Sequence, residues 1–177
     1  MSQSNQPHDD TERWAGWSQQ HGRAVRGYLW GMVRRHDLAD DLTQEVFFRA
    51  WQARDRYREE GKARAYLLRI ADRLVVDHHR KSHREVNLCD ADWCQVEPTE
   101  RARLPEEVIK QEETFAELAT TLDRLSAVQR RVLLLRYYGS LSFAEIATMM
   151  DCPIGTVLSH CHRGLLTLRS LLVETDK

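Results

Sequence analysis

Apolar residues recur every three to four positions along most of the chain, as they do on one face of an α-helix. The alternating pattern of a half-buried β-strand is nearly absent, and Gly (eight) and Pro (four) are sparse. One polar stretch without a clear period, "EVNLCDADWCQVEPTERARLPEE", interrupts the helical pattern and contains Pro98 and Pro105. The pattern predicts an all-α protein of two small helical domains joined by a flexible linker. The domains are expected over residues 8–84 and 105–175, and the linker over residues 85–104.

Helix starts are marked most clearly in the second domain. Ser126-x-x-Gln129 and Ser142-x-x-Glu145 both fit capping boxes, in which two side chains satisfy the first backbone N–H groups of a helix. After "SFAEIATMM" comes "DCP", with Pro153 suited to the first turn of a further helix. A short helix, a tight turn and a second helix together make a helix-turn-helix.

The stretch "DCPIGTVLSHCHRG" holds four potential metal ligands close together in the sequence. On a helix, His160 and His162 lie on well-separated sides, so they cannot hold one ion together with Cys161. The predicted apolar stripe of this helix is formed by Ile154, Val157, Cys161, Leu165, Leu168 and Leu172. The polar residues of the opposite side are Thr156, Ser159, His160 and Arg163. That side suits base edges and phosphates, but periodicity alone leaves a DNA-reading helix and an ordinary helical hairpin equally open.

In the first domain, "DLADDLTQEVFFRAWQARD" is predicted to form a helix with two distinct faces. Its inward face is formed by Ala39, Leu42, Val46, Phe47 and Ala50. The opposite face lines up Asp41, Glu45, Phe48 and Gln52. An acidic row with an outward aromatic side chain is typical of a partner-binding surface. A charged face whose Phe is covered by a neighbouring helix is the alternative that this pattern leaves open.

The next segment, "DRYREEGKARAYLLRIADRLVVDHHRK", predicts a helix with an apolar stripe and a basic face. The stripe is formed by Ala63, Leu67, Ile70, Ala71 and Leu74. The basic face carries Lys62, Tyr66, Arg69, Arg73 and Arg80. Cations suit phosphates and aromatic rings suit stacked bases, so this face favours single-stranded nucleic acid. The alternative is a solvated basic face.

Charge is segregated along the chain, although the net charge of the 177 residues is only −1. Residues 49–84 carry eleven Lys and Arg against five Asp and Glu, and residues 97–123 carry eight acids against three bases. Such blocks indicate nucleic-acid and protein partners. No apolar run approaches the roughly 20 residues of a membrane helix, so no contact with a membrane is expected. The polar start "MSQSNQPHDD" is not a secretory signal, and four irregularly spaced Cys form no disulfide framework, which predicts a location in the cytoplasm.

Taken together, these motifs resemble the extracytoplasmic-function sigma factors, the small two-domain branch of the bacterial sigma-70 family. "DLADDLTQEVFFRAW" resembles the family's region 2.2, and "ARAYLLRIADRLVVDHHRK" resembles regions 2.3 and 2.4. "LSAVQRRVLLLRYYGSLSFAEIATMMDCPIGTVLSHCHRGLLTLR" resembles region 4. The order and spacing of both blocks carry the resemblance. It implies a transcription initiation factor without a catalytic site, cofactor or metal, because synthesis belongs to the polymerase.

The resemblance implies a partner for each surface. Region 2.2 docks on the clamp helices of core RNA polymerase, which implies contacts from Asp41, Gln44, Glu45 and Phe48. Regions 2.3 and 2.4 melt the −10 element of promoter DNA, and the loop "YREEGK" corresponds to the pocket for a flipped base. The implied −10 contacts are Tyr57, Arg58, Lys62, Tyr66, Arg69, Arg73 and Arg80. Region 4 places its second helix in the major groove of the −35 element, which implies contacts from Thr156, Ser159, His160 and Arg163. Family members are commonly held by an anti-sigma factor, which is a further expected partner.

Three positions depart from the family pattern. Arg73 stands where Asn is usual, so reading of the −10 element is expected to differ. Leu158 and His160 stand where Lys and Arg are common. Two fewer cations predict weaker phosphate contact and a smaller salt dependence at the −35 element.

Two other functions fit parts of the sequence. A free-standing helix-turn-helix regulator would bind duplex DNA without polymerase. A zinc or redox-sensing metalloprotein would use the cluster of His78, His79, His83, Cys89 and Cys94, although the spacing of these residues is loose for zinc.

Overall fold

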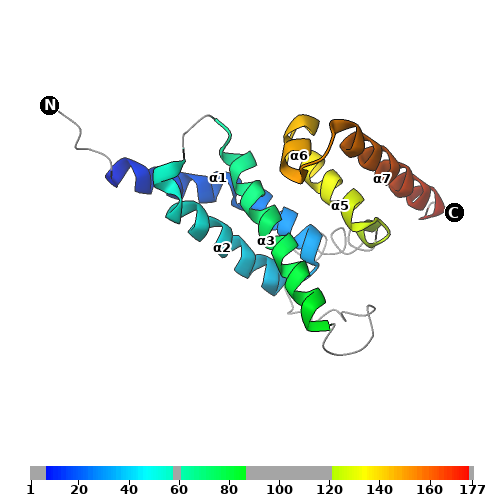
Figure 1. Ribbon diagram of the computed structural model, residues 1–177, viewed down its shortest axis with the longest axis horizontal. Coiled ribbons are helices and arrows are strands. Elements are labelled where there is room, and N and C mark those ends of the chain that lie inside the picture. The colour runs from blue at the N-terminus through cyan, green and yellow to red at the C-terminus, as the bar shows by residue number, and fades with distance from the viewer. Residues whose placement is uncertain (1–6, 58–60, 87–120, 176–177) are drawn as a thin grey trace.

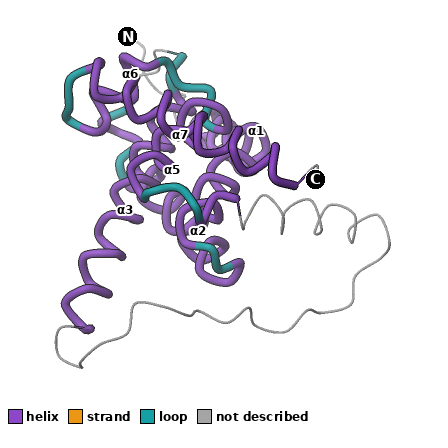
Figure 2. The backbone as a smooth tube through the Cα atoms, turned by 90° about the vertical axis from the view of Figure 1, so that its right-hand side faces the viewer, coloured by secondary structure: helices purple, strands orange, loops and turns teal. Residues whose placement is uncertain are grey.

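The computed structural model describes residues 7–57, 61–86 and 121–175, and every regular element in these ranges is a helix or a helical turn (Figure 1). The predicted all-α fold is therefore confirmed for the described part of the chain. Figure 2 shows the same helices joined by loops that are short where they are described. The predicted linker lies outside the described residues from residue 87 onward. In chain order the elements are α1 (Pro7–Val33), α2 (His36–Gln52), the 3₁₀ turn η1 (Arg54–Arg56), α3 (Ala63–Val86), α5 (Ala127–Leu133), the π-helical turn η2 (Leu134–Tyr138), α6 (Phe143–Met150) and α7 (Ile154–Thr175).

The helices α1, α2 and α3 pack against one another and form the N-terminal unit. The inward face predicted for α2 is confirmed, because Ala39, Val46 and Ala50 are buried and Leu42 and Phe47 are partly buried against the same core. The apolar spacing of three to four residues places these side chains on the side of α2 that meets its neighbours.

On α3 the predicted apolar stripe is buried at four of its five positions, and Ile70 is half-buried. Leu68 and Val75 are also buried, although the helical-wheel prediction left them out. The buried face of α3 is wider than a two-helix contact requires because α3 touches a further element. Leu68 lies against Gly139, where an added Cβ would come within 2.9 Å of its Cδ1.

The helices α5, α6 and α7 form the C-terminal unit, and both predicted capping boxes are present in it. The Ser126 hydroxyl accepts from the Gln129 N–H at 3.3 Å, and the Gln129 side chain accepts from the Ser126 N–H at 3.1 Å. Ser142 and Glu145 make the equivalent pair of hydrogen bonds at 3.2 and 2.8 Å. At Asp151 the backbone is left-handed (φ 51°), which ends α6 and turns the chain toward α7. The predicted helix-turn-helix is therefore present.

The apolar stripe predicted on α7 is wrong at two positions. Val157 and Cys161 are buried, but Ile154 is 49% exposed and Leu165 is 40% exposed. The buried face is rotated toward Gly164, where an added Cβ would lie 2.8 Å from the Leu133 side chain. Glycine carries no hydrophobic signal, so the apolar pattern alone does not place Gly164 on the buried face. Leu168 is partly buried as predicted, and the side chain of Leu172 lies outside those described.

The two units pack together and share one apolar core, which no feature of the sequence predicted. The C-terminal unit approaches α1 through α5 and η2, and Figure 1 shows α5 beside α3. On α1, Gly27 and Gly31 make the close approach possible. An added Cβ at Gly31 would lie 2.7 Å from Leu134, and one at Gly27 would overlap the ring of Tyr138. In the described residues, the two units therefore pack into a single body, although each unit is formed by its own consecutive part of the sequence.

Candidate nucleic-acid interface

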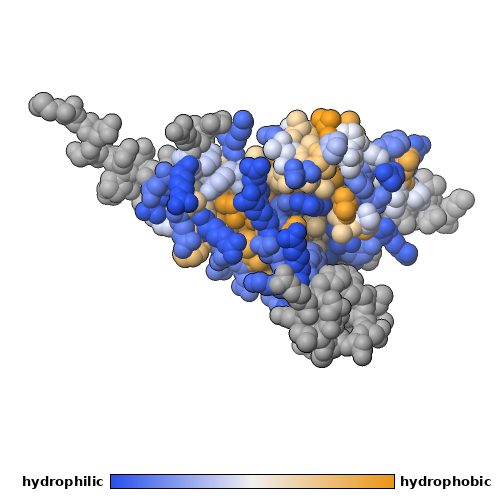
Figure 3. Space-filling model, in the orientation of Figure 1, coloured by the Kyte–Doolittle hydropathy of each residue, from blue (hydrophilic) through white to orange (hydrophobic). Residues whose placement is uncertain are grey.

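The cations predicted on α3 lie together on one exposed face of that helix. Arg69, Arg73 and Arg80 are exposed, and their spacing returns each of them to the same side of the helix. Lys62, which directly precedes α3, is exposed as well. Figure 3 shows hydrophilic side chains running down the front of the molecule over α3. Such a row of cations offers successive phosphates of a nucleic-acid strand a continuous positive surface. The remaining cation of the predicted set, Arg58, lies outside the described residues.

Three aromatic rings from separate elements meet at the start of this basic face. Tyr57 follows η1 and Tyr66 lies on α3, and their ring centroids are 4.7 Å apart. Trp17 of α1 is buried and packs against both, with centroids 4.9 Å from Tyr57 and 6.4 Å from Tyr66. Burial raises the pKa of the Tyr66 hydroxyl, so this ring stays neutral and suited to stacking. The two predicted tyrosines therefore form one platform, and Trp17 supports it.

Sequence reasoning missed Trp17, because a tryptophan on α1 has no pattern that links it to a loop forty residues later. A hollow of about 340 Å³ opens beside this ring. Its lining residues come from α1 and from the start of α3 and are Trp17, Gln20, His21, Gly61, Ala63 and Arg64. A positive φ of 70° at Gly61 directs the chain into α3 at this point, a backbone conformation that favours glycine.

The predicted polymerase-facing side of α2 is largely open to solvent. Asp41 and Gln44 are exposed, and the Phe48 side chain is 54% exposed. Glu45 is half-buried and pairs with Arg49 at 2.6 Å, so part of its charge is already matched within the helix. The sequence left open whether Phe48 lies on a partner-binding surface or is covered by a neighbouring helix. The described neighbours of α2 do not cover this ring.

The polar side of α7 carries the four residues predicted to read the major groove. Thr156 and Arg163 are exposed, whereas Ser159 and His160 are half-buried. The Arg163 guanidinium donates to the Ser159 hydroxyl at 2.7 Å, which orients both side chains along the helix. The exposed side chain of Leu158 lies on the same helix, next to the exposed Ile154 described above.

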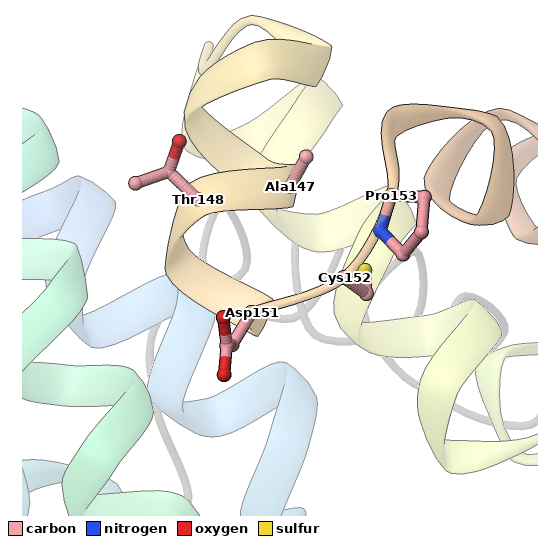
Figure 4. Close-up of a pocket in the computed structure, with 5 residues that line it drawn as sticks. All are labelled: Ala147, Thr148, Asp151, Cys152 and Pro153. Atoms are coloured by element: carbon pink, nitrogen blue, oxygen red, sulfur yellow. The ribbon is translucent and has the colours of Figure 1, made fainter.

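The turn between α6 and α7 holds a shallow hollow of about 380 Å³ (Figure 4). It is lined by Ala147, Thr148, Asp151, Cys152 and Pro153. Figure 4 shows that the side chains of Thr148, Asp151 and Cys152 point in different directions and do not converge on one point. A small ligand or ion needs converging polar groups, so this hollow is a feature of the turn.

The cysteines and histidines do not assemble into a metal site in the part of the chain that the structure describes, where no three His, Cys, Asp or Glu side chains are placed to hold an ion. Cys161 is buried in the apolar face of α7 and Cys152 is half-buried in the turn. The rings of His78 and His79 lie edge to face with centroids 6.2 Å apart. The other side chains of the possible metal cluster lie outside those described and are His83, Cys89 and Cys94. In the described ranges no helix is both long and apolar enough to cross a membrane.

Family comparison matches both units. The model of sigma-70 region 2 matches residues 17–85, and that of sigma-70 region 4 matches residues 115–168. The ECF RNA polymerase sigma factor SigX of Bacillus subtilis is 30% identical over 144 residues, which are 80% of this chain and 74% of that protein. The RNA polymerase sigma-H factor of Pseudomonas aeruginosa is 31% identical over 152 residues, 79% of this chain and 76% of that protein.

Solved structures share the same arrangement of helices. The sigma factor RpoE in complex with the anti-sigma factor NepR from Bartonella quintana has a TM-score of 0.72 at 24% identity, covering 94% of this chain and 99% of that chain. CnrH in complex with the cytosolic domain of CnrY has a TM-score of 0.65 at 20% identity, covering 94% of this chain and 91% of that chain. At these identities the likeness shows the fold alone.

Proposed function

The chain belongs to the sigma-70 family as an extracytoplasmic-function sigma factor, and on that premise we propose which surfaces carry out each step of promoter recognition. Such a factor binds core RNA polymerase and directs it to promoters, and the polymerase supplies the catalysis. We assign core binding and −10 recognition to residues 8–84, and −35 recognition to residues 105–175. Residues 85–104 join the two as a linker, and the factor acts in the cytoplasm, where polymerase and promoter DNA meet.

The −10 element is assigned to the basic face of α3 and its aromatic platform. The observation that carries this proposal is that Tyr57 and Tyr66 meet at one end of a row formed by Arg69, Arg73 and other exposed cations. Neutral rings stack on unpaired bases, and cations pair with the phosphates between them, so the combination suits a melted strand better than a duplex. Arg73 lies in the middle of this face, where it makes direct base or phosphate contact on the non-template strand.

The −35 element is assigned to the polar side of α7. A helix-turn-helix presents the N-terminal half of its second helix to the major groove, where Thr156, Ser159, His160 and Arg163 lie. Arg163 is the one exposed cation of this set, so it carries most of the phosphate or guanine contact. Asp41, Gln44, Glu45 and Phe48 of α2 are assigned to core polymerase, with the exposed Phe48 ring as anchor.

The assignment is tested by run-off transcription with core polymerase and a promoter library. The wild-type chain is expected to select promoters with a shared −10 and −35 pattern. Arg69→Ala together with Arg73→Ala is expected to abolish open-complex formation while core binding persists. Arg23→Ala, which removes an exposed cation from α1 and not from the basic face of α3, is the matched control and is expected to transcribe normally. Tight duplex binding by the chain alone, with no response to core enzyme, would instead support a free-standing regulator.

We also propose that an anti-sigma factor controls this chain. Two proteins of the same fold were solved with a partner of that kind, as the names of their complexes state. On this chain, α7 leaves a row of apolar side chains exposed that such a partner would cover: Ile154, Leu158 and Leu165. A two-hybrid screen of the source genome is expected to yield a protein that inhibits run-off transcription. Leu158→Ala with Leu165→Ala, which adds no charge near DNA, is expected to release this inhibition while transcription without the inhibitor persists, and unchanged inhibition would place the contact elsewhere.

A further inference from the structure

The half of α7 that we assign to the −35 element carries an apolar side chain among its polar ones. One side of α7 packs against α5 and α6 (Figure 1), and Val157, Cys161 and Gly164 are buried on it. At about 100° per residue, the side chains that turn away from this buried side form two pairs, each one helical turn apart. These pairs are Leu158 with His162 and Ser159 with Arg163. His162 was not among the contacts predicted from the sequence, yet it is exposed whereas His160 is half-buried.

The two outward pairs differ in their chemistry. The Arg163 guanidinium donates to the Ser159 hydroxyl at 2.7 Å, so this pair is polar and its side chains are oriented within the helix. The side chain of Leu158 has no charge and no polar atom, so it can neither neutralise a phosphate nor form a hydrogen bond with a base edge. It is nevertheless 45% exposed, which leaves an apolar surface directly beside the hydrogen-bonding pair.

The major groove offers an apolar side chain one favourable target. The edges of guanine, cytosine and adenine present hydrogen-bond donors and acceptors, whereas thymine also presents its C5 methyl group. Contact between a leucine and that methyl group removes apolar surface of both from water. Over a cytosine, the same leucine would cover the N4 amino group without accepting a hydrogen bond from it, which is unfavourable. A leucine that faces the groove therefore favours thymine and disfavours cytosine.

We infer that Leu158 is a specificity-determining residue that contacts the methyl group of a thymine in the −35 element. The inference rests on the proposed function, because it requires α7 to lie in the major groove. Leu158 lies near the start of α7, in the half that a helix-turn-helix presents to base edges. The same side chain belongs to the row assigned to the anti-sigma factor, so that partner and the thymine exclude each other at Leu158.

Deoxyuridine tests this contact directly, because it lacks the C5 methyl group of thymidine and keeps the same hydrogen-bonding edge. Promoters are first selected from a library with the full chain bound to core polymerase. Each thymine of the selected −35 element, on either strand, is then replaced in turn by deoxyuridine, and the affinity of the holoenzyme is measured by competition. At one thymine the replacement is expected to weaken binding about fourfold, which corresponds to the burial of one methyl group.

Leu158→Ala separates this contact from any effect of deoxyuridine on the DNA itself. The variant is expected to bind the thymine promoter about fourfold more weakly than wild type and to bind the thymine and deoxyuridine promoters equally. Its transcription persists on the remaining contacts with promoter and core polymerase. Leu158→Lys is also expected to lose the methyl effect and to make the salt slope of binding steeper by about 1. An unchanged salt slope would show that this position does not face DNA and would overturn the inference.

Leu166→Ala is the matched control. Leu166 is 51% exposed on the same helix, eight residues and about 12 Å beyond Leu158, and so lies outside the half that enters the groove. Its replacement removes the same apolar atoms from α7. The preference of this variant for thymine over deoxyuridine is expected to equal that of wild type. Loss of the preference in Leu166→Ala as well would show that the effect does not depend on a contact at Leu158.

Two further results would overturn the inference while the proposed function stands. One is a selected −35 element that has no thymine, or no thymine at which the methyl group matters. The other is a methyl effect that persists in Leu158→Ala, because another group would then contact the methyl. If the holoenzyme selects no promoter pattern at all, the proposed function fails and the inference fails with it.

Discussion

Phe48 and Phe47 are neighbours in the sequence with opposite environments, which makes them a matched pair for testing the polymerase interface. Phe48 is 54% exposed, whereas Phe47 packs partly buried against the core. A fully covered aromatic side chain buries about 150–250 Å², so a partner that covers the exposed half of Phe48 removes roughly 100 Å² of apolar surface from water. At about 25 cal/mol per Å², this contributes about 2.5 kcal/mol to binding, or roughly 70-fold in Kd.

Phe48→Ala is therefore expected to weaken core binding by roughly 10- to 70-fold. Its melting temperature is expected to change little, because few contacts inside the free chain are lost. Phe47→Ala is expected to lower the free energy of unfolding by about 2–3 kcal/mol, since it leaves a gap in the core. The folded fraction of that variant should still bind core polymerase normally. Affinity is measured by fluorescence anisotropy with labelled core enzyme, and stability by thermal unfolding.

The result that would refute this reasoning is a Phe48→Ala chain that binds core enzyme within about twofold of wild type. Equal losses of affinity in Phe47→Ala and Phe48→Ala, in proportion to their losses of stability, would also refute it. In that case the exposed ring would be one of the many single apolar residues that soluble proteins carry on their surface. Adding Glu45→Ala to Phe48→Ala is expected to weaken binding further, and no added effect would remove Glu45 from the interface.

Three further predictions concern the recognition surfaces and acid stability. Arg163→Ala is expected to weaken binding to a −35 duplex and to make its salt slope shallower by about 1 in a titration of affinity against salt. An unchanged slope would show that Arg163 does not touch phosphate. Trp17→Leu is expected to reduce open-complex formation while −35 binding is unchanged, because the Trp17 ring packs against both Tyr57 and Tyr66. Permanganate reactivity of the melted strand measures open-complex formation. Equal losses at both elements would indicate general unfolding. Hydrogen bonds from Ser142 lower the pKa of Glu145, so the stability from this cap is present above the pKa of the unfolded state and is lost as the pH falls through the folded pKa. Glu145→Gln is accordingly expected to lower the melting temperature by more at pH 7 than at pH 3, and the same decrease at both pH values would argue against the linkage.

The predictions from the sequence that hold best are local ones. Ser126 and Ser142 cap their helices because each hydroxyl reaches a backbone N–H three residues away, a distance that helix geometry fixes. The inward face of α2 follows from the spacing of Ala39, Val46 and Ala50, since a helix with one apolar face packs with that face inward.

The misses come from contacts that no local pattern encodes. Gly164 lets α7 approach Leu133, and this shifts the buried face away from Ile154 and Leu165. The platform under Tyr57 and Tyr66 depends on Trp17, which reaches them from another helix. Gly164 carries no hydrophobic signal, and the apolar spacing of Trp17 marks only the buried face of α1. In both cases the role of the residue is set by what packs against it in three dimensions.

The amino-acid sequence by itself determines the helices of this sigma factor, their caps, their apolar faces and the residue types that match its family, since all of these depend on spacings of a few residues. Only the tertiary structure decides that the two units close on each other. In the sequence, Asp72 is an acidic residue within a basic segment and Arg131 is a basic residue on a short helix, and no pattern links the two. The two residues pair across 59 residues of sequence because Gly27 and Gly31 of α1 let η2 pack closely against that helix. This packing excludes water from the Asp72 carboxylate.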